Sequence, residues 1–543
     1  MKYKLTNLGQ IITSTSNKYG DREFIYWEDP LTKETTTVTY KEYGEFTNKA
    51  ANMLYNLGVR KGDIVSILLP NSLEMTYFAL GVQKIGAIFG PINTMLKRDE
   101  LQYIINNNES KILIINDEFI EEIVEIRKDL PYLEEIVLIG NPYDKMLNYS
   151  ELMEKSSSSD PPSVEIDEKE DPAFIVYTGG TTGFPKGALL THYNVIFDNK
   201  MILKVKQDEE ISDINLTDPF KDSKYKFKSL VVNPMFHVNA LISSLFLIFT
   251  IGGAMLLTRK FSASNFWRLI EKYHITNTMV VPTVFAILLK VGKETKEEFD
   301  TSSLISIVSA AAPLPIELQK EFESTFNITI DAGGLGMTEV SSGCFGFPEG
   351  RRILGSVGKP LTGVQALIVD QDNPDPNNPL EHNNVGEIII KGPNVMKGYF
   401  KNPEGNAAVF LEGGWLRSGD LGYFNEEGFL FMGGRAKDMI IRGGENIYPI
   451  EIEEILYKFP GISEAVVIGK PDKIYGELPK AFITMKSGFN PSGDEIIEFC
   501  KSKLADFKVP VEVEFRDSLP KSKIGKPDKK TLQDEEKEKF KLQ

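Results

Sequence analysis

Apolar positions along the first 120 residues alternate between helical spacing and strand spacing. Helical spacing covers residues 40–57, 73–85 and 99–107, and Gly58 follows the first of these segments as a C-cap glycine would. Short apolar runs at 63–69, 86–91 and 111–115 are typical of buried strands. This β-α-β-α order predicts an α/β protein in which largely parallel sheets pack against helices.

The stretch 173–187, A-F-I-V-Y-T-G-G-T-T-G-F-P-K-G, joins an apolar strand pattern to a glycine-rich loop. Glycine lets backbone N–H groups approach a ligand, threonine adds hydroxyl donors, and Lys186 adds a charge suited to phosphate oxygens. The Walker A spacing is absent, because Phe184 and Pro185 separate Gly183 from Lys186. The pattern predicts a phosphate-binding loop, with a flexible glycine turn as the alternative.

Residues 240–258 carry no charge and are nearly long enough to cross a bilayer. Ser243, Ser244 and Thr250 interrupt the apolar run, the pair Gly252-Gly253 follows, and nothing basic flanks the segment closely on its N-terminal side. We therefore expect a buried helix, a glycine turn and a strand over 254–257, with no transmembrane segment.

Composition narrows the class of protein. A chain of 543 residues predicts at least two domains, and the net charge of −16 argues against a nucleic-acid partner. Two cysteines cannot form a disulfide framework, so we expect a reducing, cytoplasmic location. The first ten residues show no apolar run and predict no signal peptide. Residues 156–172 read as a polar linker and 207–228 as a surface insertion.

Four later stretches contain residues suited to binding a nucleotide. D-A-G-G-L-G-M-T-E (331–339) is a glycine-rich turn that can lie flat against a planar ring, and Glu339 offers an oxygen ligand for Mg²⁺. G-G-W-L-R-S-G-D-L (413–421) places Asp420 where its oxygens can accept hydrogen bonds from ribose hydroxyls. The others are G-R-A-K-D-M-I-I-R-G-G-E-N-I-Y-P (434–449) and the basic loop L-P-K-S-K-I-G-K (519–526). Each alone reads as a turn, but together they indicate a nucleotide site.

With 173–187, these stretches resemble the adenylate-forming superfamily of acyl-CoA synthetases, adenylation domains and firefly-type luciferases, in the family's order from about 171 to 526. P-M-F-H-V-N-A (234–240), S-A-A-A-P-L (309–314) and G-E-I-I-I-K-G-P-N-V-M-K-G-Y-F (386–400) add to the match, which is with fatty-acyl-CoA ligases in particular. The resemblance implies a large N-terminal AMP-binding domain, 1–433, and a small mobile α+β lid domain, 434–543, with a hinge near Lys437.

The reaction implied by the resemblance has two halves. A carboxylate attacks the α-phosphate of MgATP to give acyl-adenylate and pyrophosphate, and the thiol of coenzyme A then displaces AMP to give the thioester. The expected partners are therefore a small carboxylic acid, ATP, Mg²⁺ and coenzyme A. Assembly into a homo-oligomer stays open.

The resemblance also implies site residues. Lys526 would bridge the acyl carboxylate and the α-phosphate, His237 would lie beside that carboxylate, and Glu339 would anchor Mg²⁺ next to the catalytic Thr338. The expected nucleotide and coenzyme A contacts are Thr178, Gly179, Gly180, Thr181, Thr182, Gly183 and Lys186 for the β- and γ-phosphates, Ala312, Gly333 and Gly334 for adenine and the α-phosphate, Asp420 and Arg435 for the ribose, and Lys437, Gly443 and Gly444 for the hinge and the pantetheine tunnel.

Three positions depart from the family pattern. Gly179 stands where many relatives have serine, Leu335 replaces the aromatic residue that usually stacks on adenine, and Pro527 follows Lys526 where an aliphatic residue is usual. None of the three removes a catalytic group.

The acyl substrate is inferred from the stretches that would line its pocket, 237–241, 281–285, 309–312 and 333–344. They are apolar and small, and before Glu339 none contains Asp, Lys or Arg, although Asp331 lies close by. This favours a medium- or long-chain fatty acid. The alternatives are an aromatic or carnitine-type short acid, a stand-alone adenylating enzyme that loads a carrier protein, luciferase-type oxygen chemistry, and a non-catalytic nucleotide-binding protein.

Overall fold

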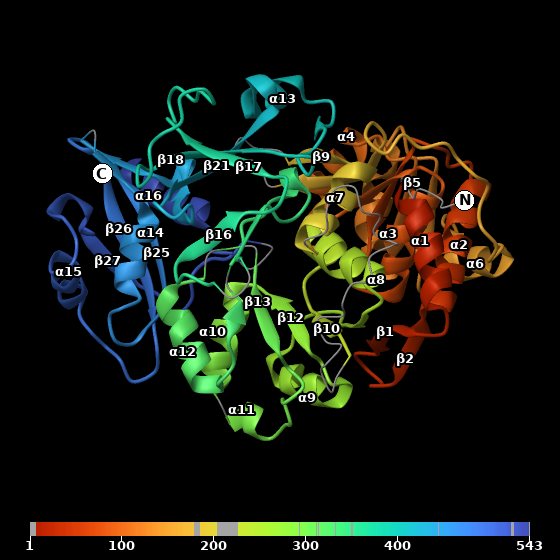
Figure 1. The fold of residues 1–543 in the computed structure, drawn as a ribbon, viewed down its shortest axis with the longest axis horizontal. Coiled ribbons are helices and arrows are strands. Elements are labelled where there is room, and N and C mark those ends of the chain that lie inside the picture. The colour runs from red at the N-terminus through yellow and green to blue at the C-terminus, as the bar shows by residue number, and fades with distance from the viewer. Residues whose placement is uncertain are drawn as a thin grey trace.

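The computed structural model describes residues 7–178, 185–203, 226–292, 294–310, 312, 314–331, 333–348, 351–443, 445–522 and 526–541. Figure 1 shows the arrangement, with the N-terminal elements on the right and the C-terminal elements on the left. Most of the segment 207–228, expected to be a surface insertion, lies outside the described residues.

An eight-stranded sheet contains the strand that precedes the predicted phosphate loop. Six of its strands are parallel, while β9 runs antiparallel to β8 and β19 antiparallel to β9. In sheet order its strands are β19 (Gly398–Tyr399), β9 (Lys186–Thr191), β8 (Pro172–Thr178), β4 (Ile88–Pro91), β3 (Ile64–Leu68), β5 (Ile112–Asn116), β6 (Glu135–Ile139) and β7 (Leu147–Asn148).

A seven-stranded sheet lies beside the first and is parallel except at one edge, where β1 and β2 form a hairpin. In sheet order its strands are β14 (Ile330–Asp331), β13 (Ser306–Ser309), β12 (Asn277–Val280), β10 (Lys228–Val231), β11 (Ala254–Leu257), β1 (Glu23–Glu28) and β2 (Thr35–Thr39).

Helices separate and cover these two sheets. One hydrophobic cluster unites residues of both sheets with those of four helices, α1 (Leu8–Tyr19), α2 (Tyr40–Asn56), α3 (Leu73–Lys84) and α7 (His192–Ile202). A second cluster packs three helices on the seven-stranded sheet, α9 (Ala263–Tyr273), α10 (Pro282–Val291) and α12 (Ile316–Phe326). A third packs α4 (Arg98–Asn107) and α5 (Ile120–Ile126) on the eight-stranded sheet. The shorter helices are α6 (Tyr149–Lys155), α8 (Leu247–Thr250), α11 (Glu294–Glu297) and α13 (Pro403–Val409).

The third sheet differs from the expected parallel architecture, because all of its pairs are antiparallel. Its strands are β15 (Phe345–Gly346), β16 (Ser356–Pro360), β22 (Leu430–Arg435), β21 (Trp415–Phe424), β18 (Gly386–Lys391) and β17 (Gln365–Val369), with β20 (Phe410–Leu411) paired to β21. The neighbours β21 and β22 are joined by the short turn 425–429, a connection that only antiparallel neighbours can make.

The C-terminal elements form a five-stranded sheet with its own hydrophobic cluster. Its strands are β24 (Glu445–Ile447), β23 (Ile440–Arg442), β26 (Gly476–Met485), β25 (Ile462–Asp472) and β27 (Glu512–Phe515), and its helices are α14 (Pro449–Leu456), α15 (Gly493–Lys501) and α16 (Lys529–Lys541). It touches the rest of the molecule where α14 packs on β22 and where Lys486 forms a two-pronged ion pair with Glu321 of α12, at 2.5 and 2.6 Å.

Local predictions agree with these elements to within one or two residues in most cases. The uncharged stretch 240–258 is a buried helix, a turn and a strand, as expected, although its first part is a π-helix, Asn239–Phe246, rather than an α-helix. Within the described residues no helix is long and apolar enough to cross a membrane. Both cysteines, Cys344 and Cys500, are buried and unpaired.

Candidate active site

Asp420 and Arg435 form an ion pair across two neighbouring strands. They are direct partners in the register of β21 and β22, and the Arg435 Nε lies 2.7 Å from the Asp420 Oδ1. Only 7% of the Asp420 side chain is exposed. Burial raises the pKa of Asp420 to about 6, against the opposing effect of the positive charges of Arg435 and Lys526. A carboxylate held this way has oxygens suited to accepting hydrogen bonds from a diol.

Lys526 reaches this pair from the C-terminal part of the chain. Burial is the main cause that lowers its pKa, the charge of Arg435 lowers it further, and Asp420 opposes both. The charge of Lys526 also acts on His237, whose pKa is lowered to about 4, chiefly by burial. The His237 Nε2 is buried without a hydrogen-bond partner. Four predicted site residues, distant in sequence, are therefore close in space.

Glu339 and Lys186 meet at a tyrosine that the sequence analysis did not single out. The Tyr399 hydroxyl donates to the Glu339 Oε1 at 2.8 Å, and the Lys186 Nζ lies 5.2 Å from the centre of the Tyr399 ring. Glu339 lies in the short 3₁₀ turn Thr338–Val340, and the charge of Glu339 contributes to the raised pKa of Asp420. Electrostatic contact thus links the two groups of residues. The feature of the sequence that could have identified Tyr399 is its position within 386–400, a stretch that matches the family pattern.

Two glycines of the stretch 331–339 allow the close packing of the turn that they form. A Cβ at Gly333 would lie 2.0 Å from the Phe347 ring, and one at Gly336 would lie 1.9 Å from the Ser342 carbonyl oxygen. Gly336 also pairs with Gly343 as an isolated antiparallel bridge. Close packing therefore excludes a side chain at Gly333 and Gly336. The turn is held in a compact shape beside Glu339.

The other predicted nucleotide contacts are placed less fully than the Asp420 group. Thr178 pairs with Lys186 across β8 and β9, so it lies at the mouth of the phosphate loop. Ala312 is half-buried, and no contact ties it to the Asp420 group. Six further predicted contacts lie outside the described residues, namely Gly179, Gly180, Thr181, Thr182, Gly183 and Gly444.

Lys437 and Gly443 follow Arg435 in the chain, Lys437 two residues after it and Gly443 directly after β23 of the C-terminal sheet. Lys437 is exposed on the 3₁₀ turn Ala436–Asp438, between Arg435 and the C-terminal sheet. Gly443 has a φ of 58° and its N–H donates to the Tyr475 carbonyl oxygen at 2.8 Å. It borders a depression of about 370 Å³ whose other lining residues are Arg442, Glu445, Tyr475, Asp506 and Phe507. None of these belongs to the Asp420 group.

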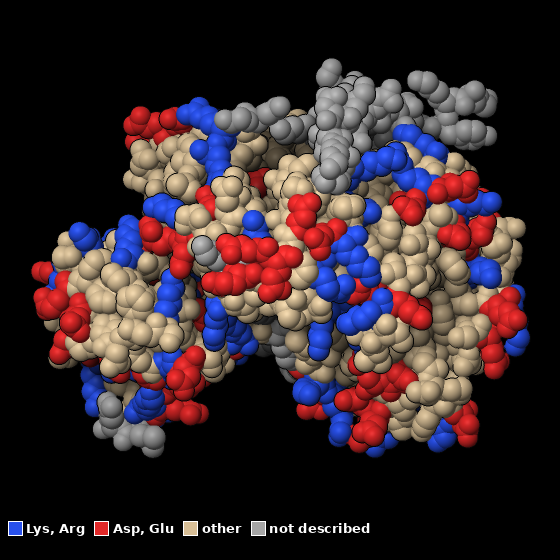
Figure 2. All heavy atoms as spheres, turned by 90° about the horizontal axis from the view of Figure 1, so that it is seen from below, with Lys and Arg blue, Asp and Glu red and all other residues tan. Residues whose placement is uncertain are grey.

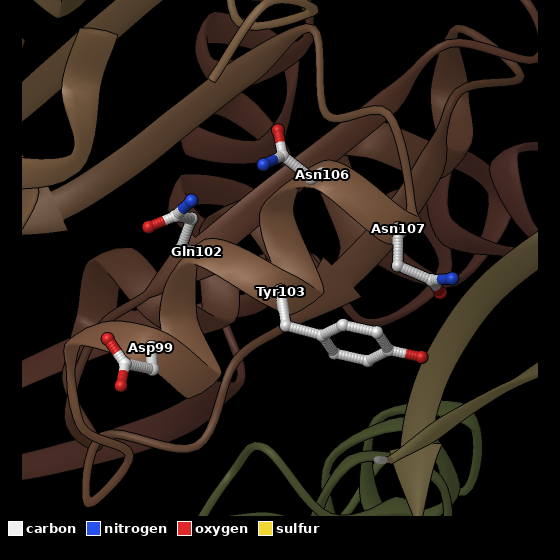
Figure 3. A pocket seen from close by; sticks show the side chains of 5 residues that line it. All are labelled: Asp99, Gln102, Tyr103, Asn106 and Asn107. Atoms are coloured by element: carbon white, nitrogen blue, oxygen red, sulfur yellow. The ribbon is translucent and has the colours of Figure 1, made fainter. Parts of the chain in front are cut away.

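A shallow groove of about 610 Å³ runs along α4, lined by Asp99, Gln102, Tyr103, Asn106 and Asn107. Figure 3 shows Tyr103 and Asn107 projecting toward the same side of the helix. The Tyr177 hydroxyl, one residue before Thr178, donates to the Asn107 Oδ1 at 2.6 Å. The groove therefore adjoins the strand that leads into the phosphate loop.

Asp198 is a buried acid that the sequence analysis overlooked. Its Oδ1 accepts the Gly343 N–H at 3.1 Å, so it borders the stretch 333–344 expected to line the acyl pocket. Burial raises the pKa of Asp198 well above its usual value and so favours the uncharged form of the side chain. A Cβ built on Gly343 would meet no atom within 4 Å, which indicates open space beside this half-buried residue.

The described residues contain no cluster of three or more His, Cys, Asp or Glu side chains that could enclose a metal ion. Mg²⁺ is commonly bound by one or two carboxylates together with substrate phosphates. A single carboxylate, Glu339, near Lys186 fits that mode of binding.

On the face shown in Figure 2, acidic and basic side chains are interspersed.

Comparison with known proteins agrees with this geometry. Residues 12–400 match the model of the AMP-binding enzyme family, and residues 451–526 match that of the AMP-binding enzyme C-terminal domain. The chain is 34% identical to a long-chain-fatty-acid–CoA ligase of Bacillus subtilis (strain 168), covering 90% of this chain and 88% of the relative. It is 32% identical to a crotonobetaine/carnitine–CoA ligase of Salmonella typhimurium, covering 97% and 98%.

Among solved structures, the anthranilate CoA ligase AuaEII in complex with anthranoyl-AMP superposes with a TM-score of 0.85 at 26% identity, covering 97% of both chains. The resemblance drawn from the motifs is thereby confirmed. The chain belongs to the AMP-binding enzyme family, and within it to the AMP-forming acyl-CoA ligases.

Proposed function

We propose that this ligase activates a medium- or long-chain fatty acid, and that Lys526 is the group that drives adenylation. The observation that carries the proposal is the convergence of Lys526, Asp420, Arg435 and His237 from separate parts of the chain. In a partly buried setting, a lysine ammonium strongly stabilises negative charge that develops between two anions. Transfer of the adenylyl group from ATP to the carboxylate, with pyrophosphate leaving, creates that charge between the carboxylate and the α-phosphate.

The other residues take roles that match their chemistry. Asp420 accepts hydrogen bonds from the ribose hydroxyls, and Arg435 fixes its orientation through their ion pair. Glu339 holds Mg²⁺, which neutralises phosphate charge when bound, and Tyr399 orients the Glu339 carboxylate. His237, neutral at physiological pH, donates or accepts a single hydrogen bond beside the acyl carboxylate.

The fatty-acid assignment has two supports. The Bacillus subtilis relative is named a long-chain-fatty-acid–CoA ligase. The π-helix Asn239–Phe246 contributes buried apolar residues beside His237, and burial favours the uncharged form of Asp198, the acid next to Gly343. A pocket without a charged anchor selects an apolar chain over an amino acid or another charged acid. Carnitine-type and aromatic acids remain the alternatives, because other relatives carry those names.

The test is pyrophosphate release from ATP over a panel of octanoate, palmitate, benzoate and carnitine, with and without coenzyme A. We expect release with the fatty acids and thioester formation only when coenzyme A is present. A carrier-loading enzyme would release pyrophosphate without making acyl-CoA. A greater kcat/KM for benzoate or carnitine than for both fatty acids would overturn the chain-length proposal but leave the ligase reaction intact.

A variant tests the role of Lys526. Lys526→Ala should slow acyl-adenylate formation at least about 100-fold, because the lost charge acts in the transition state. Thiolysis of supplied acyl-adenylate by coenzyme A should continue at near the original rate. Lys530→Ala is the matched control, since Lys530 is an exposed lysine of the same segment. An unchanged adenylation rate in Lys526→Ala would refute the assignment.

A further inference from the structure

We propose that Glu464 and Glu453 are positioning residues that hold Lys526 in its place by clamping the chain on both sides of it. The proposal rests on the role given to Lys526 above. The segment 519–529 contains four lysines at 521, 523, 526 and 529. Two of them, Lys521 and Lys529, are held by carboxylates of the C-terminal sheet and its helix, which leaves Lys526 to the active site.

The first clamp lies before Lys526. Lys521 forms an ion pair with Glu464 of β25, and less than a third of either side chain is exposed. Leu519, two residues earlier, is buried with Val466 and Ile468 of the same strand. This end of the segment is therefore fixed to β25 by both an apolar contact and an ion pair.

The second clamp lies after Lys526. The Lys529 Nζ is 2.8 Å from the Glu453 Oε1, and the two side chains are only 20% and 17% exposed. The same Glu453 oxygen accepts the Val467 N–H at 2.8 Å. Glu453 thus joins three elements, because it belongs to α14, bonds to β25 and pairs with the first residue of α16.

Backbone bonds connect the two clamps into one unit. Lys521 and Pro527 are antiparallel bridge partners, and the Asp528 N–H donates to the Pro520 carbonyl oxygen at 2.9 Å. The Ser522 N–H donates to the Lys526 carbonyl oxygen at 2.7 Å, and the Lys526 N–H donates to the Ser522 Oγ at 3.2 Å. Residues 523–525 lie outside the described residues and carry no part of the argument.

The contrast among the lysines indicates the division of roles. Within the described residues no carboxylate lies within ion-pair distance of Lys526, whereas Lys521 and Lys529 each have one. A lysine side chain has many rotamers, so its ammonium reaches a fixed point only if its backbone is fixed first. Misplacement by about 1 Å at a reacting centre can cost two orders of magnitude in rate. Loosening either clamp should therefore affect the half-reaction that uses Lys526.

The experiment measures the two half-reactions separately in the full-length protein. Glu464→Lys and Glu453→Gln should each slow acyl-adenylate formation about tenfold, and thiolysis of supplied acyl-adenylate should change less than about twofold. Glu453→Gln keeps an oxygen for the Val467 N–H and removes only the ion pair. The double variant Glu464→Lys/Lys521→Glu restores an ion pair of reversed polarity and should recover most of the adenylation rate.

Controls separate positioning from general stability. Lys508 of the 3₁₀ turn Asp506–Lys508 and Glu451 of α14 form an ion pair, 2.5 Å apart, that includes no residue of 519–529, and Glu451→Lys should leave both half-reactions unchanged. If Glu464→Lys does not fold, as shown by circular dichroism, Glu464→Gln replaces it.

Equal slowing of both half-reactions, no slowing of either, or failure of the double variant to recover would each overturn the proposal. If Lys526→Ala itself leaves adenylation intact, the proposed function fails, and this outcome is distinct from failure of the clamps alone.

Discussion

At the scale of single residues, burial favours the uncharged form of four titratable groups in and beside the site. The pKa of Asp420 rises to about 6, that of His237 falls to about 4, that of Lys526 is lowered and that of Asp198 is raised well above its usual value. A site with little water and few free counter-charges interacts strongly with the charges of its substrates. Its activity should consequently depend on pH near the raised pKa of Asp420.

The pH profile of ATP use tests this dependence. Asp420 becomes protonated below about pH 6, and a protonated carboxyl is a weaker acceptor for the ribose hydroxyls. We expect kcat/KM for ATP to fall as pH drops from 7 to 5, by at most about tenfold per unit for one proton. In Asp420→Asn the value should be lower throughout and nearly flat over this range. An identical pH profile in the variant would assign the titration to another group.

Asp198 gives a stability prediction of definite sign. Because the pKa of Asp198 in the folded state lies above the unfolded value of about 3.9, the folded state binds the proton more tightly. The free energy of unfolding therefore falls as pH rises from the unfolded pKa to the folded pKa. Asp198→Asn keeps an acceptor for the Gly343 N–H and removes the titration. Its Tm, compared with the wild type, should therefore rise between pH 4 and pH 8. A Tm difference that does not change with pH would contradict the raised pKa.

At the scale of elements, the short strand β19 brings distant chemistry together. Its pairing with β9 places Tyr399 opposite Ala188, close to Lys186 and within reach of the 3₁₀ turn that carries Glu339. Two strands more than 200 positions apart in the sequence thus share one phenol with a turn that lies between them in the sequence. The proposed Mg²⁺ ligand is oriented by that contact.

Tyr399→Phe separates the two contacts of this phenol. The ring beneath Lys186 is kept, but the hydrogen bond to Glu339 is lost. We expect the Mg²⁺ concentration for half-maximal adenylation to rise about 10-fold or more, because a hydrogen bond that orients a metal ligand typically contributes that much to metal affinity. Tyr399→Leu removes the ring as well and should also raise KM for ATP. Unaltered Mg²⁺ dependence in Tyr399→Phe would exclude the orienting role.

Sequence could predict elements whose signal is local, and it missed those that depend on contacts. The helix α2 was expected because its apolar spacing ends at Gly58, and β8 because an apolar run precedes the glycine loop. The antiparallel third sheet was not foreseen, since strand direction follows from which strands meet. Tyr399 and Asp198 were missed for the same reason: a lone Tyr or Asp carries no spacing signal, and burial decides its chemistry.

At the scale of the whole molecule, Lys526 precedes α16 in the C-terminal part of the chain, whereas Asp420 and Arg435 lie on strands of the third sheet. The C-terminal sheet has its own hydrophobic cluster and meets the rest through few contacts, among them α14 on β22 and Lys486 on Glu321. Gly443 meanwhile borders a depression whose lining residues do not include Asp420. We propose that this arrangement of the C-terminal part, with Lys526 near Asp420, is the one in which adenylation occurs. Thioester formation is expected to need a second arrangement of the two parts.

Lys437→Pro tests the proposed hinge. Lys437 is exposed on the turn that joins the two parts, and proline fixes φ near −65° and removes a donor. If rotation at this residue follows adenylation, the variant should slow thioester formation several-fold more than acyl-adenylate formation, as measured by single-turnover assays of each step. Equal losses in both steps would place the hinge elsewhere.

The burial of both cysteines has a practical consequence for watching that rotation. Cys344 and Cys500 are 0% exposed, so the folded protein offers thiol reagents no natural target at its surface. Cysteines introduced at 321 and 486, where the side chains now meet, would accept a donor and an acceptor dye. Energy transfer between them should be high while acyl-adenylate forms and fall when coenzyme A arrives, and a short bismaleimide across the same two positions should arrest the enzyme with its adenylate bound.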